Sequence, residues 1–247
     1  MINLAIDIGN SRTKVAFFEN SALLGTHSWE NAGPEELERL LEKYRPGKAI
    51  LASVTEPDPR LIACLEQHTD LRHFPGDLPL PVKNNYRTPR TLGADRLAAA
   101  IGTGSYGEDS DRLVIIAGTC ITYNFVNRRN EFIGGAISPG LHMRFEAMHT
   151  FTGQLPLITL DKEFEGFLGR DTRESILAGV QAGSLAEAGQ MISSYEEHYP
   201  GLRVFLCGGD AGFFGKRLKN SIFADRIVLD RELILKGLDR VLNYQYK

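Results

Sequence analysis

The amino-terminal stretch of the chain is INLAIDIGNSRTKVAFF, residues 2–18. Two apolar segments, 2–6 and 14–18, surround a polar turn at 9–11, and this pattern predicts two strands joined by a tight turn. Strand patterns of this kind are mixed with amphipathic helix patterns along the rest of the chain. The sequence therefore predicts an α/β protein.

The turn between these strands carries groups suited to binding phosphate. Asp7 lies at the end of the first strand, where a carboxylate can hold Mg²⁺ directly or through water. Gly9 lets the backbone approach a phosphate closely. A hairpin in which Asp7 only caps the bend is the alternative interpretation. Further donors and one positive charge come from Asn10, Ser11, Thr13 and Lys14.

The second half of the chain repeats this pattern. Apolar segments at 112–116 and 121–126 flank Gly118-Thr119-Cys120, so that Gly118 aligns with Gly9. If the two turns face each other, Ser11, Thr119 and Cys120 become phosphate donors on opposite sides. The glycine-rich stretch 102–109 marks the expected boundary. We expect a first domain at 1–109 with the first phosphate motif and the substrate motif. We expect a second domain at 110–247 with the second phosphate motif.

A third candidate is Gly93-Ala94-Asp95-Arg96, which enters an alanine-rich helix after a polar loop at 75–90. An Asp at a helix start is usually a cap. In the functional interpretation Asp95 is a general base that accepts an alcohol proton, and Arg96 binds substrate or phosphate.

Composition excludes several classes of protein. The chain has 247 residues, 43% hydrophobic, with a formal charge of −3. It shows no Lys/Arg block and no long uncharged apolar run, so we expect neither nucleic-acid nor membrane binding. Its three cysteines have no paired spacing, and the start of the chain does not resemble a signal peptide. We therefore expect a cytoplasmic protein.

Taken together, the motifs resemble those of the type III pantothenate kinases, a family of the actin-like ATPase superfamily. The resemblance spans essentially the whole chain. Tyr86 and the LGADR stretch resemble the family's substrate motif. In order, the matching stretches are DIGNSRTK at 7–14, LGADR at 92–96, AGTCIT at 117–122, GGAISPGL at 134–141, TGQLP at 152–156, GRDT at 169–172 and CGGDA at 207–211.

The resemblance implies two duplicated ribonuclease-H-like domains with a central cleft, working as a homodimer. It implies phosphorylation of pantothenate by ATP to 4′-phosphopantothenate, the first step of coenzyme A synthesis. Asp95 would be the base, Asp7 would place Mg²⁺, and Thr172 would contact substrate across the dimer interface. ATP would be bound by Asp7, Ile8, Gly9, Asn10, Ser11, Arg12, Thr13, Lys14 and Thr119, and pantothenate by Tyr86, Gly93, Ala94, Asp95, Arg96 and Thr172.

One position departs from the family pattern. The family usually has Asp two residues before the glycine of the second phosphate motif, where it helps to hold a monovalent cation such as K⁺ or NH₄⁺. This chain has Ile116 there, and Asn124 replaces a second acidic residue. We therefore expect weak cation dependence or none.

Two other functions remain open from sequence. One is a kinase for another small hydroxy acid or sugar, and the other is a non-catalytic transcriptional accessory factor. The joint presence of Asp7, Lys14, Asp95 and Arg96 favours an active enzyme.

Overall fold

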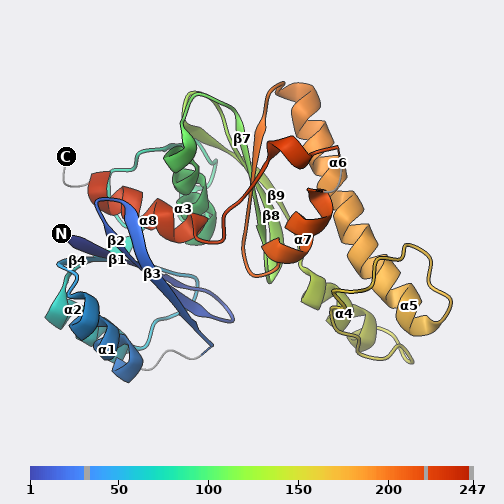
Figure 1. The fold of residues 1–247 in the computed structure, drawn as a ribbon, viewed down its shortest axis with the longest axis horizontal. Coiled ribbons are helices and arrows are strands. Elements are labelled where there is room, and N and C mark those ends of the chain that lie inside the picture. The colour runs from blue at the N-terminus through green and yellow to red at the C-terminus, as the bar shows by residue number, and fades with distance from the viewer. Residues whose placement is uncertain (31–33, 220–221, 245–247) are drawn as a thin grey trace. The chain divides into compact units, whose positions relative to one another are not determined.

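The computed structural model describes residues 1–30, 34–219 and 222–244, and the chain divides into two compact units. The first unit comprises the described residues of Met1–Asp109, Arg129–Ile133 and Glu232–Lys247, and the second comprises those of Ser110–Arg128 and Gly134–Arg231. Figure 1 shows the helices and strands of both units.

The first unit is built on a five-stranded sheet of order β3-β2-β1-β4-β5. The central strand β1 pairs antiparallel with β2 and parallel with β4, while β3 and β5 extend the sheet antiparallel and parallel. The strands are β1 (Ile2–Ile8), β2 (Thr13–Glu19), β3 (Ala22–Trp29), β4 (Lys48–Ser53) and β5 (Asp70–Phe74).

Helices cover both faces of this sheet. Helices α1 (Pro34–Tyr44) and α2 (Pro59–His68) pack on one face through leucines spaced four apart, such as Leu37 and Leu41. Helices α3 (Ala94–Gly102) and α8 (Leu233–Tyr244) pack on each other, and α8 contacts β1 and β4 from the other side of the sheet (Figure 1). Because both faces are covered, the central strands β1 and β4 are buried except at their first and last residues.

Helix α8 lies in the first unit, although the sequence analysis assigned it to the range 110–247. Its backbone approaches α3 so closely that a Cβ atom on residue 237 would lie 1.8 Å from the carbonyl oxygen of Ala98. Gly102 makes the reciprocal approach, since a Cβ there would lie 2.1 Å from the carbonyl oxygen of Leu233. Glycines on both helices therefore allow this packing.

The second unit repeats the arrangement of the first. Its strands are ordered β11-β10-β7-β8-β9, with β7 antiparallel to β8 and parallel to β10. Read from the central strand, this is the order of the first sheet, and it confirms the predicted duplication. The strands are β7 (Arg112–Ala117), β8 (Cys120–Val126), β9 (Glu131–Pro139), β10 (Arg203–Cys207) and β11 (Ile227–Leu229).

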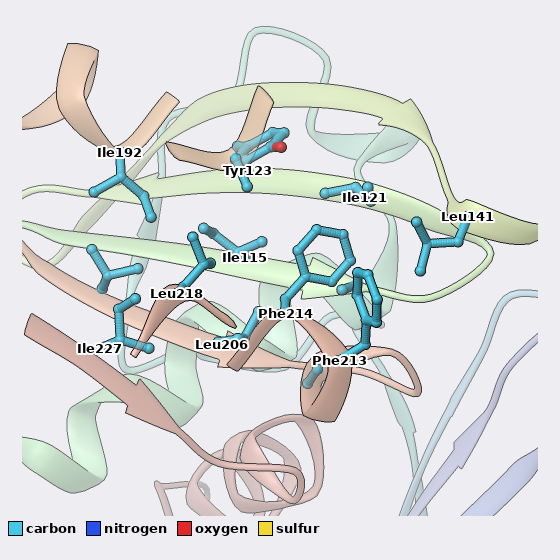
Figure 2. Close-up of a cluster of buried hydrophobic side chains, with 14 of the residues drawn as sticks. Ile115, Ile121, Tyr123, Leu141, Ile192, Leu206, Phe213, Phe214, Leu218 and Ile227 are labelled. Atoms are coloured by element: carbon cyan, nitrogen blue, oxygen red, sulfur yellow. The ribbon is translucent and has the colours of Figure 1, made fainter. Parts of the chain in front are cut away.

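The core of the second unit lies on one face of its sheet. Alternate residues of β7 and β8, among them Ile115 and Tyr123, point toward helix residues such as Ile192 and Phe214 (Figure 2). The helices are α4 (Leu141–Thr150), α5 (Thr172–Leu177), a π-helical segment (Ala178–Ala182), α6 (Gly183–His198) and α7 (Ala211–Leu218).

The remaining elements are short. Strand β6 (Lys83–Asn84) pairs with the first residues of β9 inside the first unit. Three 3₁₀ turns lie at Pro89–Thr91, Thr103–Tyr106 and Ala224–Arg226. No helix within the described ranges is both long enough and apolar enough to cross a membrane.

Candidate active site

Asp7 lies one residue before the end of β1, directly across from Lys14 on β2. Its side chain is buried, with the residue only 8% exposed. Burial raises the pKa of the Asp7 carboxyl to about 7, the negative charge of Asp95 raises it as well, and Lys14 opposes the rise. The site therefore holds a carboxylate whose charge is not fully compensated by the protein.

The turn after β1 is closed by one backbone hydrogen bond, from the amide of Gly9 to the carbonyl of Arg12 at 2.9 Å. At the surface, Nη2 of Arg12 forms an ion pair with Oε1 of Glu30 at 2.9 Å. The Arg12 guanidinium therefore already has an acidic partner. Of the other predicted ligands in this stretch, Ile8 is half-buried, Thr13 is buried, and Asn10 and Ser11 are exposed.

Asp95 lies in the first turn of α3, which begins after Gly93. Burial raises the pKa of the Asp95 carboxyl, and hydrogen bonds from the backbone N–H of Arg96 and of Asp95, with the charge of Arg96, oppose the rise. Gly93 is the N-cap of this helix and, within the described part of the chain, no side chain makes a capping hydrogen bond there, so the Asp95 carboxylate contacts backbone N–H groups of the first turn without being the cap that the alternative interpretation expected. The Asp95 carboxylate also lies near enough to Asp7 for its negative charge to raise the pKa of the Asp7 carboxyl. A Cβ on residue 93 would lie 2.6 Å from Oδ1 of Asp95, which explains the glycine.

Arg96 and Tyr86 form the third part of this group. The guanidinium carbon of buried Arg96 lies 5.6 Å from the centre of the Tyr86 ring. That ring packs edge-on against Phe132, with 6.0 Å between centroids. Ala94, beside them in α3, is buried. The first unit therefore brings together Asp7, Lys14, Asp95, Arg96 and Tyr86, which the sequence singled out separately.

This arrangement fits a magnesium ion held with phosphate groups. Among the described residues, no group of three or more His, Cys, Asp or Glu side chains could hold a metal by itself. Mg²⁺, however, is commonly held by one or two carboxylates together with substrate phosphates and water. A buried carboxylate with a raised pKa next to a second one is a place where a cation relieves repulsion.

In the second unit, three polar turns meet at the end of β7. The amide of Gly140 donates to the carbonyl of Thr119 at 3.0 Å, and the amide of Asp210 donates to the carbonyl of Ala117 at 2.9 Å. Gly208, at φ +99°, leaves only 2.2 Å between its Cβ position and the Ala117 oxygen. The backbone carbonyl of exposed Thr119 is therefore held by the amide of Gly140 in the neighbouring turn.

Asp210 is a charged residue at these turns to which the sequence analysis gave no role of its own. It occupies the position before α7 but makes no capping hydrogen bond with its side chain. Burial raises the pKa of the Asp210 carboxyl, while His142 and Lys162 oppose the rise. In the sequence, the position of Asp210 directly after Gly208-Gly209 was the feature that could have marked it as a candidate site residue.

Ile116 is buried in β7 and lies across from Thr122 on β8. The nearby Asn124 is fully buried and donates to the Thr122 hydroxyl at 2.9 Å and to the Val114 carbonyl at 3.1 Å. Ile116 is therefore part of the β7–β8 pairing, Asn124 bonds within the same sheet, and the Ile116 side chain offers no oxygen to a cation.

Thr172 is the first residue of α5 and is exposed. It follows Asp171, whose carboxylate caps the helix by accepting from the amide of Glu174 at 2.8 Å. It belongs to the second unit, whereas the other predicted substrate residues belong to the first.

Two solved structures share the fold. One is described as a Baf family transcriptional activator from Campylobacter jejuni, with a TM-score of 0.61, 19% identity and 98% of each chain covered. The other is the activator of 2-hydroxyisocaproyl-CoA dehydratase from Clostridium difficile with bound ADPNP, with a TM-score of 0.56, 12% identity, and 100% and 97% covered. At these identities the likeness concerns the fold, which is that of two ribonuclease-H-like units.

The sequence comparisons are more specific. The family model of the type III pantothenate kinases matches residues 3–194. The type III pantothenate kinase of Bacteroides fragilis strain ATCC 25285 is 43% identical over 244 residues, 98% of both chains. That of Flavobacterium johnsoniae is 38% identical over 246 residues, 99% of this chain and 98% of the other. The chain belongs to the type III pantothenate kinase family.

Proposed function

We propose that the protein transfers the γ-phosphoryl group of ATP to the hydroxyl of pantothenate. The product is 4′-phosphopantothenate, and the reaction is the first step of coenzyme A synthesis. Family membership supports the reaction. The observation that carries the proposal is the position of Asp7, across from Lys14 on one hairpin and near enough to Asp95 for the charge of that carboxylate to raise its pKa.

Asp95 accepts the proton of the pantothenate hydroxyl as that oxygen attacks phosphorus. Its burial raises the pKa of the carboxyl, which makes it a stronger proton acceptor than an ordinary surface Asp. The neighbouring guanidinium of Arg96, lying over the Tyr86 ring, is suited to the single negative charge of pantothenate.

The backbone and hydroxyl donors of the turn between β1 and β2 bind the phosphates, and Thr119 does so from the second unit. Asp7 would hold Mg²⁺ together with phosphate oxygens. When bound, the ion neutralises negative charge on the phosphates. Lys14 adds a fixed positive charge on the strand facing Asp7.

We also infer a cytoplasmic homodimer. Large apolar side chains of the second unit are strongly exposed, among them Phe151 at 85% and Phe167 at 87%, which favours a protein partner. Thr172 lies close in sequence to Phe167 and would contact substrate at the neighbouring site. The cysteines Cys64, Cys120 and Cys207 form no disulfide with one another, which suits a reducing compartment.

The test is an ADP-release assay of the purified protein with pantothenate, acetate and hexoses as alternative acceptors. Of these acceptors, we expect only pantothenate to support ADP release. Asp95→Asn should lower the turnover rate by about 10²–10⁴-fold. Asp77→Asn, an exposed Asp of the same unit, is the matched control. Turnover only with acetate or a hexose would refute pantothenate as the substrate. Near-normal activity of Asp95→Asn would refute Asp95 as the general base.

A transcriptional role without catalysis has weaker support. The likeness to a transcriptional activator is one of fold at 19% identity. A regulator has no use for a proton acceptor beside a second buried carboxylate.

A further inference from the structure

The carboxylate of Glu187 on α6 accepts hydrogen bonds from three other elements of the second unit. The Tyr123 hydroxyl on β8 donates to Oε1 at 2.9 Å. The Ser138 hydroxyl on β9 donates to Oε2 at 3.0 Å, and Nη2 of Arg144 on α4 donates to the same oxygen at 2.5 Å. One side chain therefore joins two strands and two helices.

Arg144 extends this contact to the phosphate turn. Its Nε donates to the carbonyl oxygen of Pro139 at 2.8 Å, and its Nη2 also donates to the Ser138 hydroxyl at 2.7 Å. The next residue, Gly140, donates its amide to the Thr119 carbonyl. A Cβ on residue 140 would lie 2.1 Å from the Gly118 oxygen. The turn at 139–140 thus rests directly on the turn at 118–119.

The side chains that meet at Glu187 are buried or half-buried, and both carboxylate oxygens of Glu187 accept hydrogen bonds. Tyr123 is only 1% exposed, and its ring lies in the core shown in Figure 2. Partial burial of Glu187 favours its neutral form. The hydrogen bonds from Arg144, Tyr123 and Ser138 outweigh this and lower the pKa of the Glu187 carboxyl. Loss of the carboxylate charge would weaken three contacts together, because charged acceptors make the stronger hydrogen bonds.

We propose that Glu187 is a positioning residue for ATP: through Arg144 and the Pro139–Gly140 turn, it holds the Gly118–Thr119 turn in the shape that binds phosphate. The inference rests on the proposed function of that turn. The hydrogen bonds of Glu187 go to Tyr123, Ser138 and Arg144, and its effect on substrate affinity passes from Arg144 through the backbone. The same helix continues through the π-helical segment to α5, so Glu187 also ties the phosphate turn to the element that bears Thr172.

The experiment compares Glu187→Gln with Glu196→Gln, a variant on the same helix whose carboxylate pairs with Arg226. We expect the KM for ATP to rise on the order of tenfold in Glu187→Gln while the KM for pantothenate stays unchanged. Glu196→Gln should leave both constants unchanged. ADP binding, measured by calorimetry, should weaken by the same factor as the KM for ATP rises.

Arg144→Lys provides a second test, because Lys keeps the charge but cannot bridge Glu187 and Pro139. It should also raise the KM for ATP, and the double variant should be no worse than the poorer single variant. If Glu187→Gln does not fold, Tyr123→Phe and Ser138→Ala each remove one contact and should show smaller increases.

An unchanged KM for ATP in Glu187→Gln and Arg144→Lys, or in the two milder variants, would overturn the proposal. So would an equal rise in both KM values with a lower Tm, which indicates a purely structural role. Wild-type protein that does not phosphorylate pantothenate would instead refute the proposed function.

Discussion

Replacing Asp7 by Asn tests the electrostatics of the site directly, because Asn keeps the shape of the side chain but cannot ionise. In the folded protein, burial and the neighbouring Asp95 raise the pKa of the Asp7 carboxyl from 3.8 to about 7. The folded state therefore binds a proton more tightly than the unfolded chain does. Activity should fall because Mg-ATP loses a ligand, whereas the affinity for pantothenate should stay unchanged.

The size and sign of the stability effect follow from this pKa. A shift of about three units corresponds to about 4 kcal/mol at about 1.4 kcal/mol per unit. Because the folded pKa is raised, the stabilisation by the bound proton is complete below pH 3.8 and is lost as the pH rises through about 7. Above pH 7 the folded protein contains an ionised, buried Asp7. Asp7→Asn should then be more stable than wild type by up to about 4 kcal/mol, and this gain should shrink toward pH 4.

Urea unfolding between pH 5 and pH 8.5 measures the effect. Trp29, the single tryptophan of the chain, lies on β3 of the same unit and reports its unfolding by fluorescence. Asp77→Asn, at an exposed position of that unit, should show no comparable gain. The reasoning is refuted if Asp7→Asn is no more stable than wild type at pH 8.5, or if its gain does not depend on pH.

Three further predictions concern other parts of the molecule. The initial rate should respond little to K⁺ at constant ionic strength with choline as replacement, because Ile116 offers no side-chain oxygen; strong saturable activation at low millimolar K⁺ would contradict this. Gly237→Ala should lower the free energy of unfolding by about 1–3 kcal/mol in urea, since its Cβ would lie 1.8 Å from the Ala98 oxygen. Gly189→Ala, whose Cβ would make an ordinary 3.5 Å contact, is the control, and equal losses would count against the close packing. Mixing inactive Asp95→Asn chains with inactive Thr172→Ala chains should restore part of the activity if Thr172 serves the neighbouring subunit; no rescue after verified subunit exchange would argue against a shared site.

Several elements escaped the sequence analysis for physical reasons. Strand β3 (Ala22–Trp29) lies at the sheet edge, and most of its residues are exposed, so it lacks the apolar run of a central strand. Strand β5 (Asp70–Phe74) forms the other edge and has mostly polar residues. Edge strands are defined by the backbone they pair with, and a single sequence does not record that pairing.

The packing partner of helix α8 could not be predicted from a single sequence either. Leu238 and Val241 belong to its apolar stripe, and both residues are buried. A stripe identifies the buried face but not the surface that covers it. The close approach of Gly237 to Ala98 places the helix against α3 in the first unit.

The sequence by itself determined the duplicated hairpins, the family and the residue types of the site. These depend on local patterns, namely an apolar strand, a glycine and a polar turn, repeated at Gly9 and Gly118. Only the tertiary structure decided how those residues act on one another. Asp7 has a raised pKa because the fold buries it and brings Asp95 beside it, and Glu187 contacts three elements that are distant in sequence. Burial and charge interaction depend on distance in space, and the chain fixes that distance only when it folds.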